Sequence, residues 1–152
     1  MPYVNAKLCV TSSPELTARI TALLTDLTVR ILRKERTRTT VVVEYVPTAQ
    51  WTVGGAIANR ADPRRFYVEA KITAGTNSRD EKARYVHEVQ RGLESSLGLG
   101  QAEGYVFVQE LPADSWGHDG ETQEVRYVRN SFAFQVEEAG RTHPKDRHPE
   151  SA

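Results

Sequence analysis

The sequence predicts an α/β (α+β) domain built from two consecutive β-α-β units, which form a four-stranded sheet with two helices on one face. Three observations predict this fold. The 152-residue chain repeats itself at an offset of 64 to 65 residues, each copy has the pattern strand, helix, strand, and each helix is long enough to cross between two parallel strands. A hydrophobic content of 39% supplies one core rather than two large ones.

The repeat is visible in two blocks of each half. Residues 3–8 (YVNAKL) align with residues 67–72 (YVEAKI) at an offset of 64. Residues 41–51 align with residues 106–116 at an offset of 65, and each of these blocks ends on a tryptophan. One inserted residue between the two blocks accounts for both offsets.

The first half begins with a β-rich run at residues 3–10, which predicts a strand. Residues 12–15 (SSPE) are typical of a helix start, because serine caps, proline suits the first turn and glutamate favours the helix dipole. Residues 39–46 predict the second strand. Between these two strands, apolar residues recur at helical spacing: Leu16, Ile20, Leu23, Leu24, Leu27 and Ile31.

The second half has the same order of elements. Residues 66–73 predict a strand, and residues 78–81 (SRDE) form a capping box that starts a helix. Gly98 and Gly100 end that helix, and residues 104–111 predict the fourth strand. The apolar stripe of the second helix is Ala83, Val86, Val89, Leu93 and Leu97.

Glycines follow the second strand of each unit. Gly54 and Gly55 come soon after Trp51, and Gly117 and Gly120 come after the second tryptophan. Glycine adopts the positive φ values that tight turns require, so both segments predict tight turns or short edge hairpins.

The domain organisation follows from the repeat. We expect one domain over residues 1–127, with the first repeat at 2–60 and the second at 66–120. Residues 128–152 form a C-terminal extension, of which residues 141–152 lack apolar periodicity and are expected to be flexible. Helices on one face of the sheet leave the other face uncovered, which predicts burial of that face between subunits.

Composition excludes several classes of partner. Twenty basic and twenty acidic residues give a formal net charge of zero, so no nucleic-acid or membrane binding is predicted. No segment reaches the roughly 18 apolar residues of a membrane span, and no leader-like N-terminus is present, so we expect a cytoplasmic protein. The single cysteine, Cys9, excludes an internal disulfide and is expected to be a buried thiol. The partner is expected to be a small molecule or another subunit.

Pro2 is the residue best placed to carry chemistry. A methionine followed by proline is the context in which the initiator is removed, and removal would expose a secondary amine. Nearby cations and burial lower the pKa of such an amine, so it could act as a general base near neutral pH. The second repeat has Phe66 in the place of Pro2, so the repeat predicts one such site per chain.

These features resemble the tautomerase superfamily, founded on 4-oxalocrotonate tautomerase. The resemblance rests on Pro2 opening a strand, a capped helix, a valine-rich strand and residues 51–55 (WTVGG), and it covers residues 2–120. The duplicated length is similar to the two-unit members, and the layout is most similar to cis-3-chloroacrylic acid dehalogenase. The resemblance implies a homotrimer in which the N-terminal proline lies in a pocket beside a neighbouring subunit.

The polar residues of the family sites are replaced in this chain. Relative to the dehalogenase, Thr28 stands for a histidine, Thr73 and Thr76 for two arginines, and Phe107 for a tyrosine, while His118 falls near a glutamate. The two arginines of the founding enzyme fall on Ser12 or Asn77 and on Thr40 or Phe107. Threonine cannot replace a bidentate arginine–carboxylate contact, so a dicarboxylate held in the usual way is disfavoured.

Other residues are therefore candidates for binding a substrate. The cations are Arg38, expected on the same strand face as Thr40, Lys71, which precedes Thr73 by two residues, and Arg79 in the first helical turn. Each of them could equally be a solvated surface charge. The full set of candidate substrate-binding residues is Arg38, Trp51, Lys71, Thr73, Asn77, Arg79, Phe107, Trp116 and His118. No spacing of histidines suggests a metal site, and no cofactor is expected.

Three functions remain open at this point. The leading one is cofactor-independent keto–enol tautomerisation of a small 2-oxo acid or enol, with Pro2 as general base. The second is hydration, dehalogenation or decarboxylation of a three-carbon acid, with protonated Pro2 as the acid. The third is a trimeric binding protein that has kept the fold and lost activity.

Overall fold

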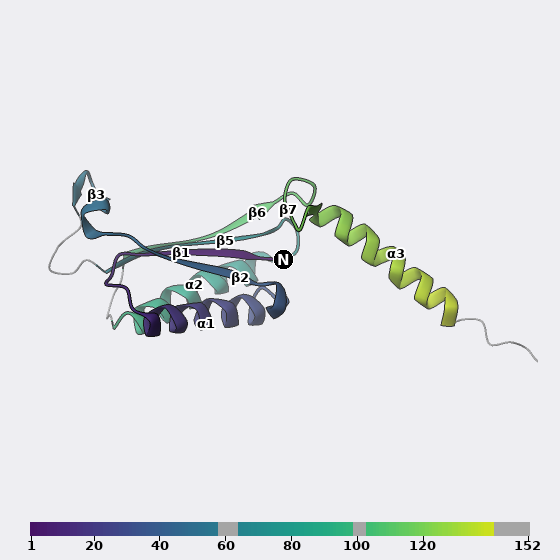
Figure 1. Ribbon diagram of the computed structural model, residues 1–152, viewed down its shortest axis with the longest axis horizontal. Helices are drawn as coiled ribbons and strands as arrows, with labels where there is room; N and C mark the ends of the chain where they lie inside the picture. The colour runs from purple at the N-terminus through teal and green to yellow at the C-terminus, as the bar shows by residue number, and fades with distance from the viewer. Residues whose placement is uncertain (58–63, 99–102, 142–152) are drawn as a thin grey trace, which may run out of the picture. The chain divides into compact units, whose positions relative to one another are not determined.

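The computed structural model describes residues 1–57, 64–98 and 103–141, with only the backbone for residues 134–141. It divides into two compact units, Met1–Leu111 and Pro112–Ala152, each of which is described by itself (Figure 1). The first unit contains both repeats up to the end of the fourth long strand. It holds the sheet, the two helices expected from the sequence and Pro2.

A four-stranded sheet forms the centre of the first unit. Its strands are β1 (Tyr3–Leu8), β2 (Thr40–Tyr45), β5 (Arg65–Thr73) and β6 (Glu103–Leu111), in the order β2-β1-β5-β6. The pairs β1–β2 and β5–β6 are parallel, as the two crossover helices predict, and β1 pairs with β5 antiparallel. The two repeats are thus joined through their first strands, and the predicted fold class is confirmed.

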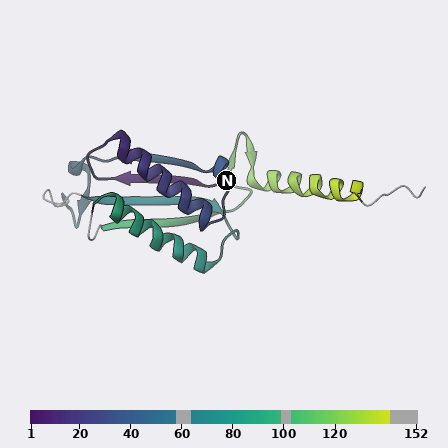
Figure 2. The same cartoon turned by 90° about the horizontal axis from the view of Figure 1, so that it is seen from below.

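Both long helices of the first unit cover the same face of the sheet (Figures 1 and 2). In α1 (Pro14–Arg30), the side chain of Ser13 accepts a hydrogen bond from the Leu16 N–H at 3.0 Å, and Pro14 occupies the first turn. In α2 (Arg79–Ser96), Ser78 and Glu81 form the predicted capping box. The starts of both helices are therefore set by local sequence.

The core lies between the sheet and these two helices. Alternate residues of β1 and β5 point toward the helices and are fully buried, as the period of two in a strand requires. Tyr85 and Thr28 are also fully buried, and their hydroxyl groups lie 3.0 Å apart. The buried strand and helix residues are Val4, Ala6, Leu8, Phe66, Val68, Ala70, Ile72, Ile20, Leu24, Leu27, Val89 and Leu93.

One short hairpin follows the second strand of each repeat, as the glycines predict. In the first hairpin, β3 (Thr52–Val53) pairs with β4 (Ala56–Ile57) after a short 3-10 helix, η2 (Thr48–Gln50). Its turn residues Gly54 and Gly55 have φ values of 61° and 82°. In the second hairpin, β7 (Gly117–His118) pairs with β8 (Glu121–Thr122), and the turn residues Asp119 and Gly120 have φ values of 51° and 77°. Positive φ at both central residues is typical of the turns that join two-residue hairpins.

The second unit also contains a helix that has no counterpart among the sequence expectations. This helix, α3 (Gln123–Arg141), runs through the boundary expected at residue 127 without a break. The N–H of Gln123 bonds to the Trp116 carbonyl at 3.0 Å, which attaches the helix start to the β7–β8 hairpin. The expected flexible tail falls mostly on residues 142–152, outside the described residues. Among the described helices, none is long and apolar enough to cross a membrane.

Candidate active site

Pro2 lies at one end of the central strand β1. It is buried, and its carbonyl accepts a hydrogen bond from the Thr40 N–H at 3.2 Å, which fixes it beside the start of β2. Because β1 is antiparallel to β5, the start of β1 lies beside the end of β5, where Tyr3 pairs with Lys71. The end of the sheet that holds Pro2 therefore also holds the loop from β5 to α2. We call this end of the first unit the proline end.

Lys34 is the cation of the proline end that sequence reasoning missed. Its Nζ donates a hydrogen bond to Thr76 Oγ1 at 2.8 Å, and Thr76 Oγ1 in turn donates to the Thr73 carbonyl at 2.6 Å. Thr73 and Thr76 are the positions where the family resemblance places two arginines. A positive charge thus reaches this loop from another segment, the connection between α1 and β2.

The environment of Lys34 disfavours its charged form. Burial lowers the pKa of Lys34 below its usual 10.5, and the carboxylates of Glu81 and Glu110 act in the opposite direction. Glu110 is itself occupied by other donors, since it bonds to Lys82 Nζ at 2.7 Å and to the Gly75 N–H at 3.2 Å. An opposite charge close to an ammonium group favours its protonated form. A substrate carboxylate beside Lys34 would therefore add to the effect of Glu81 and Glu110 and stabilise the charged lysine.

Lys71 and Thr73 lie on the face of the sheet that no helix covers, because they alternate with the buried Ala70 and Ile72. Lys71 Nζ lies 3.6 Å from a carboxylate oxygen of Glu69. Lys71 is thus a second cation near the start of β1, on the opposite face of the sheet from the helices.

Asn77 and Arg79 lie at the same end, but Asn77 has a structural role. Its side-chain nitrogen donates to the Leu32 carbonyl at 3.0 Å and to Glu81 Oε2 at 3.1 Å, which ties the loop to the end of α1. Arg79 is exposed in the first turn of α2.

One sequence expectation at this end needs correction. Arg38 does not lie on the strand face of Thr40, because it belongs to a 3-10 helix, η1 (Arg36–Arg38), that precedes β2, and it pairs with Glu35 at 3.2 Å. Thr28, which stands in the place of a family histidine, is buried between the helices against Tyr85. Burial raises the pKa of Tyr85 to about 12, so this tyrosine and its threonine partner form a neutral core contact.

Trp51 and Phe107 do not approach Pro2 within one chain. Trp51 lines a cavity of about 330 Å³ together with Phe66 and Tyr105, at the end of the sheet opposite to Pro2. From Pro2 to Leu8, the strand residue that pairs with Phe66, β1 spans about 20 Å at ~3.3 Å per residue. Phe107 lies in the middle of β6 on the uncovered face, where its ring centroid is 5.1 Å from that of Tyr67.

Trp116 and His118 belong to the second unit. Among the described residues, the indole N–H of Trp116 is buried without a hydrogen-bond partner. His118 Nδ1 lies 2.9 Å from Asp119 Oδ2, and both residues line a cavity of about 410 Å³ within the β7–β8 region. The contact with Asp119 orients the imidazole through Nδ1.

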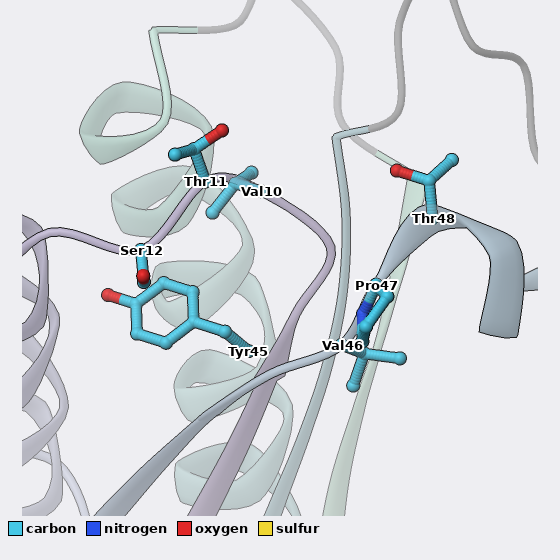
Figure 3. Close-up of a pocket in the computed structure, with 7 residues that line it drawn as sticks. All are labelled: Val10, Thr11, Ser12, Tyr45, Val46, Pro47 and Thr48. Carbon is cyan, nitrogen blue, oxygen red and sulfur yellow. The ribbon is translucent and has the colours of Figure 1, made fainter.

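The β1–α1 loop and the end of β2 form another cavity, of about 300 Å³ (Figure 3). Its polar lining consists of hydroxyl groups, including those of Ser12 and Thr48, and it contains no charged residue. Thr48 also contacts the buried thiol of Cys9, with 3.8 Å between Sγ and Oγ1. Ser12 stands at one of the family arginine positions, so this cavity lacks the cation that would bind a carboxylate there.

The comparison with known families gives a match that begins at Pro2. Residues 2–59 match the family model described as tautomerase enzyme, and this segment begins with Pro2 and includes β1, α1 and β2. The first repeat of the chain is therefore similar to the tautomerase family. Pro2 thus opens the matched segment and directly precedes the central strand β1. A comparison with curated proteins finds no match.

Solved structures extend the likeness in fold to both repeats. A structure described as the F6 fused 4-OT wild-type asymmetric trimer has a TM-score of 0.72 at 17% identity and covers 82% of this chain and 98% of its own. Native fused 4-OT has a TM-score of 0.71 at 18% identity, with 81% and 97% coverage. FG41 malonate semialdehyde decarboxylase inhibited by 3-bromopropiolate has a TM-score of 0.65 at 15% identity, with 83% and 96% coverage. At these identities the likeness is one of fold, and it confirms the two-unit layout.

Proposed function

We propose that the protein is a cofactor-independent keto–enol tautomerase that acts on a small 2-oxo acid or its enol, with the N-terminal amine of Pro2 as general base. The observation that carries this proposal is the position of Pro2, which is buried at the end of a central strand beside a loop that a lysine reaches. The role requires removal of Met1, because only then is the proline nitrogen an amine rather than an amide.

The surroundings of Pro2 suit a base that works near neutral pH. Burial disfavours the protonated form of an amine, and so does a positive charge close to it. Pro2 is buried, and Lys34 reaches the β5–α2 loop at the same end of the unit. A neutral amine can then accept a proton at the pH where the protein works.

The proposed reaction moves one proton. The Pro2 nitrogen takes the proton from the enol hydroxyl group, and the electron pair of that O–H bond forms the carbonyl. The electrons of the carbon–carbon double bond then form a C–H bond at the β-carbon with the proton that Pro2 returns. The amine is regenerated and no other reactant is needed. A cation near the oxygen stabilises the negative charge that develops on it.

Lys34 and Lys71 are the proposed partners of the substrate carboxylate. The family arginine positions carry Thr73 and Thr76, so the charge must come from elsewhere, and Lys34 already lies in hydrogen-bond contact with Thr76. A lysine is a point charge rather than a bidentate fork, which favours a monocarboxylate over a dicarboxylate.

We propose that the remaining candidate residues act from a neighbouring copy in a homotrimer. Trp51 and Phe107 lie too far along the sheet to meet Pro2 within one chain. The uncovered face of the sheet exposes Tyr105 and Phe107, which is a reason for it to be buried by other copies. Two fused 4-OT structures of this fold are described as trimers.

The test compares the mature wild type with Pro2→Ala in the ketonisation of phenylenolpyruvate, followed by ultraviolet absorbance. Alanine also permits removal of Met1, so both proteins have an N-terminal amine, which intact mass verifies. We expect kcat/KM to fall by about 10² or more, the usual contribution of a positioned general base. Equal rates would remove Pro2 from the mechanism.

The same proteins distinguish the alternative functions. Turnover of 3-chloroacrylate or malonate semialdehyde, with no ketonisation, would replace the tautomerase proposal by the one in which protonated Pro2 acts as an acid. Absence of turnover on every substrate, together with retained Met1, would indicate a binding protein that has kept the fold.

A further inference from the structure

The two ends of the sheet in the first unit are related by the sequence repeat. Phe66 stands in the second repeat where Pro2 stands in the first, and it starts a strand beside the loop that follows β1. The connections after the two long helices also match, since Arg33 and Gly98, 65 residues apart, both have positive φ values of 55° and 72°. The end that holds Phe66, the phenylalanine end, is thus the structural counterpart of the proline end.

At the proline end, polar side chains join the β5–α2 loop to the end of α1. Arg33 Nε lies 2.9 Å from Glu81 Oε1, and Asn77 bonds to both Glu81 and the Leu32 carbonyl. These contacts link the loop to the end of the helix.

At the phenylalanine end, the residues at the same repeat positions cannot form these contacts. Leu16 replaces Glu81, Gly98 replaces Arg33 and Ser12 replaces Asn77. A cavity of about 430 Å³ lies at this end instead, between the β1–α1 loop and the end of α2. Its volume is within the range of small-molecule sites, roughly 300–1,000 Å³.

The lining of this cavity suits an anion with an apolar body. Among the described residues that line it, Arg19 and Arg64 contribute positive charge and none is acidic. Thr11 and Ser96 add hydroxyl groups, while Leu16 and Leu97 supply apolar surface. Arg64 Nη1 donates to the Gly98 carbonyl at 3.0 Å, which holds the guanidinium at the end of α2.

We propose that this cavity is a second, non-catalytic site that binds a small monocarboxylate with an apolar body. The two arginines bind the carboxylate, and the leucines contact the apolar part. Phe66, which stands at the repeat position of Pro2, has no amine, so this end lacks a counterpart of the proposed base. The proposal does not depend on the reaction at the proline end, since within one chain the two sites lie at opposite ends of the sheet and share no residue.

The test is a titration of the full-length ¹⁵N-labelled protein with 3-phenylpropanoate, an unreactive aryl monocarboxylate, followed by NMR. We expect saturable shifts at the backbone amides of residues 10–13, 15–19 and 96–97. Arg19→Gln combined with Arg64→Gln should weaken binding at these amides by at least about tenfold, because each arginine donates a charge-assisted hydrogen bond. Arg84→Gln is the matched control, since Arg84 is the repeat counterpart of Arg19 and is exposed on α2.

The outcomes separate this site from the proline end. Shifts that persist in Pro2→Ala and disappear in the double variant support the proposal whether or not the protein is an active tautomerase. Absence of saturable shifts in the wild type would overturn it, as would equal weakening by Arg84→Gln. Arg19→Gln alone changes an exposed side chain, so it gives a readout even if the double variant fails to fold.

Discussion

Lys34 brings a half-buried ammonium group to within 2.8 Å of Thr76 Oγ1 at the proline end. Hydrogen bonds to charged groups contribute roughly 1.5–3 kcal/mol each, more than neutral ones. Lys34 also lies on a connection whose backbone is fixed, since its N–H bonds to the Thr28 carbonyl at 3.4 Å and the preceding Arg33 has positive φ. Its charge is therefore positioned by the backbone rather than free to move over the surface.

Replacing Lys34 by methionine keeps its length and removes its charge. We expect kcat/KM for phenylenolpyruvate to fall by about tenfold to a hundredfold, from the loss of one charge-assisted hydrogen bond to the carboxylate. Because burial lowers the pKa of Lys34, its charge is lost as pH rises through a value below 10.5, so the wild-type KM should rise there and that of the variant should not. Arg91→Met, a change at an exposed position of α2, is the control, and an equal loss in both variants would contradict the role.

The catalytic candidate could be predicted from the sequence, but its partners could be predicted only in part. Pro2 follows from its position in the chain and from the repeat. Lys34 could not be found in this way, because its contact with Thr76 spans 42 residues and depends on how α1 ends. Arg38 was placed wrongly, because the local sequence did not show that the chain makes a 3-10 turn before it enters β2.

At the scale of elements, Glu81 in the first turn of α2 connects the start of this helix, the β5–α2 loop and the connection that follows α1. Glu81 accepts from the Ser78 N–H, accepts from Asn77 and pairs with Arg33. These contacts hold the pKa of Glu81 below its ordinary value of 4.5, and the hydrogen bond from Ser78 contributes most.

Glu81→Gln should therefore destabilise the protein in a pH-dependent way. A carboxylate whose pKa is lowered in the folded state contributes stability above its unfolded pKa, and this contribution is lost as pH falls through the folded pKa. We expect the difference in free energy of unfolding between wild type and variant to be largest above about pH 5 and to shrink below 4.5. Urea unfolding at pH 7 and pH 3 measures it, and a constant difference would show that the charge of Glu81 is not involved.

Gly104 in β6 allows the ring of Phe66 to lie against the backbone of the neighbouring strand. The two residues pair directly in the parallel register, and a Cβ at position 104 would overlap the ring. Gly104→Ala should cost about 1–3 kcal/mol of stability, as overpacking in a core does.

A double-mutant cycle tests this contact. Phe66→Leu removes the ring, so Gly104→Ala should cost clearly less in that background, as measured by chemical denaturation. Additive costs would mean that the ring is not what excludes a side chain at position 104.

Most elements of the first unit could be predicted, because caps and alternation are local signals. Ser13 and Ser78 start the two helices where the sequence predicts, and the glycine-containing turns form the expected hairpins. The antiparallel pairing of β1 with β5 has no local signal, since it depends on the packing of one repeat against the other. The helix α3 lies beyond the repeat, and its apolar residues Val125, Val128 and Phe132 recur at helical spacing, a signal that sequence reasoning missed.

At the scale of the whole molecule, the uncovered face of the sheet is the main unsatisfied surface of the first unit. Tyr105 and Phe107 are 68% and 45% exposed there, and their ring centroids lie 6.1 Å apart. Aromatic residues on an exposed face favour association, and the sequence predicts this from the placement of the helices alone. How many copies associate could not be predicted from local patterns, and the family resemblance supplies the expectation of three.

Phe107→Lys should disrupt this association, because it places a charge where aromatic rings would be buried. We expect the wild type to have the mass of three 17.0 kDa chains in light scattering and the variant to shift toward smaller species. Val86→Lys adds the same charge at an exposed apolar position of α2 and should leave the mass unchanged. A single-chain mass for the wild type would contradict the trimer.

The central claim is that the mature chain has a reactive amine at Pro2. Peptide mapping by mass spectrometry after treatment with 3-bromopropiolate, the inhibitor named for the decarboxylase structure of this fold, tests it directly. We predict an N-terminal peptide that begins at Pro2 and carries one adduct on its nitrogen, with no adduct when Met1 is retained. An N-terminal peptide that still begins with Met1, or a mature peptide that stays unmodified while other residues react, would contradict the account.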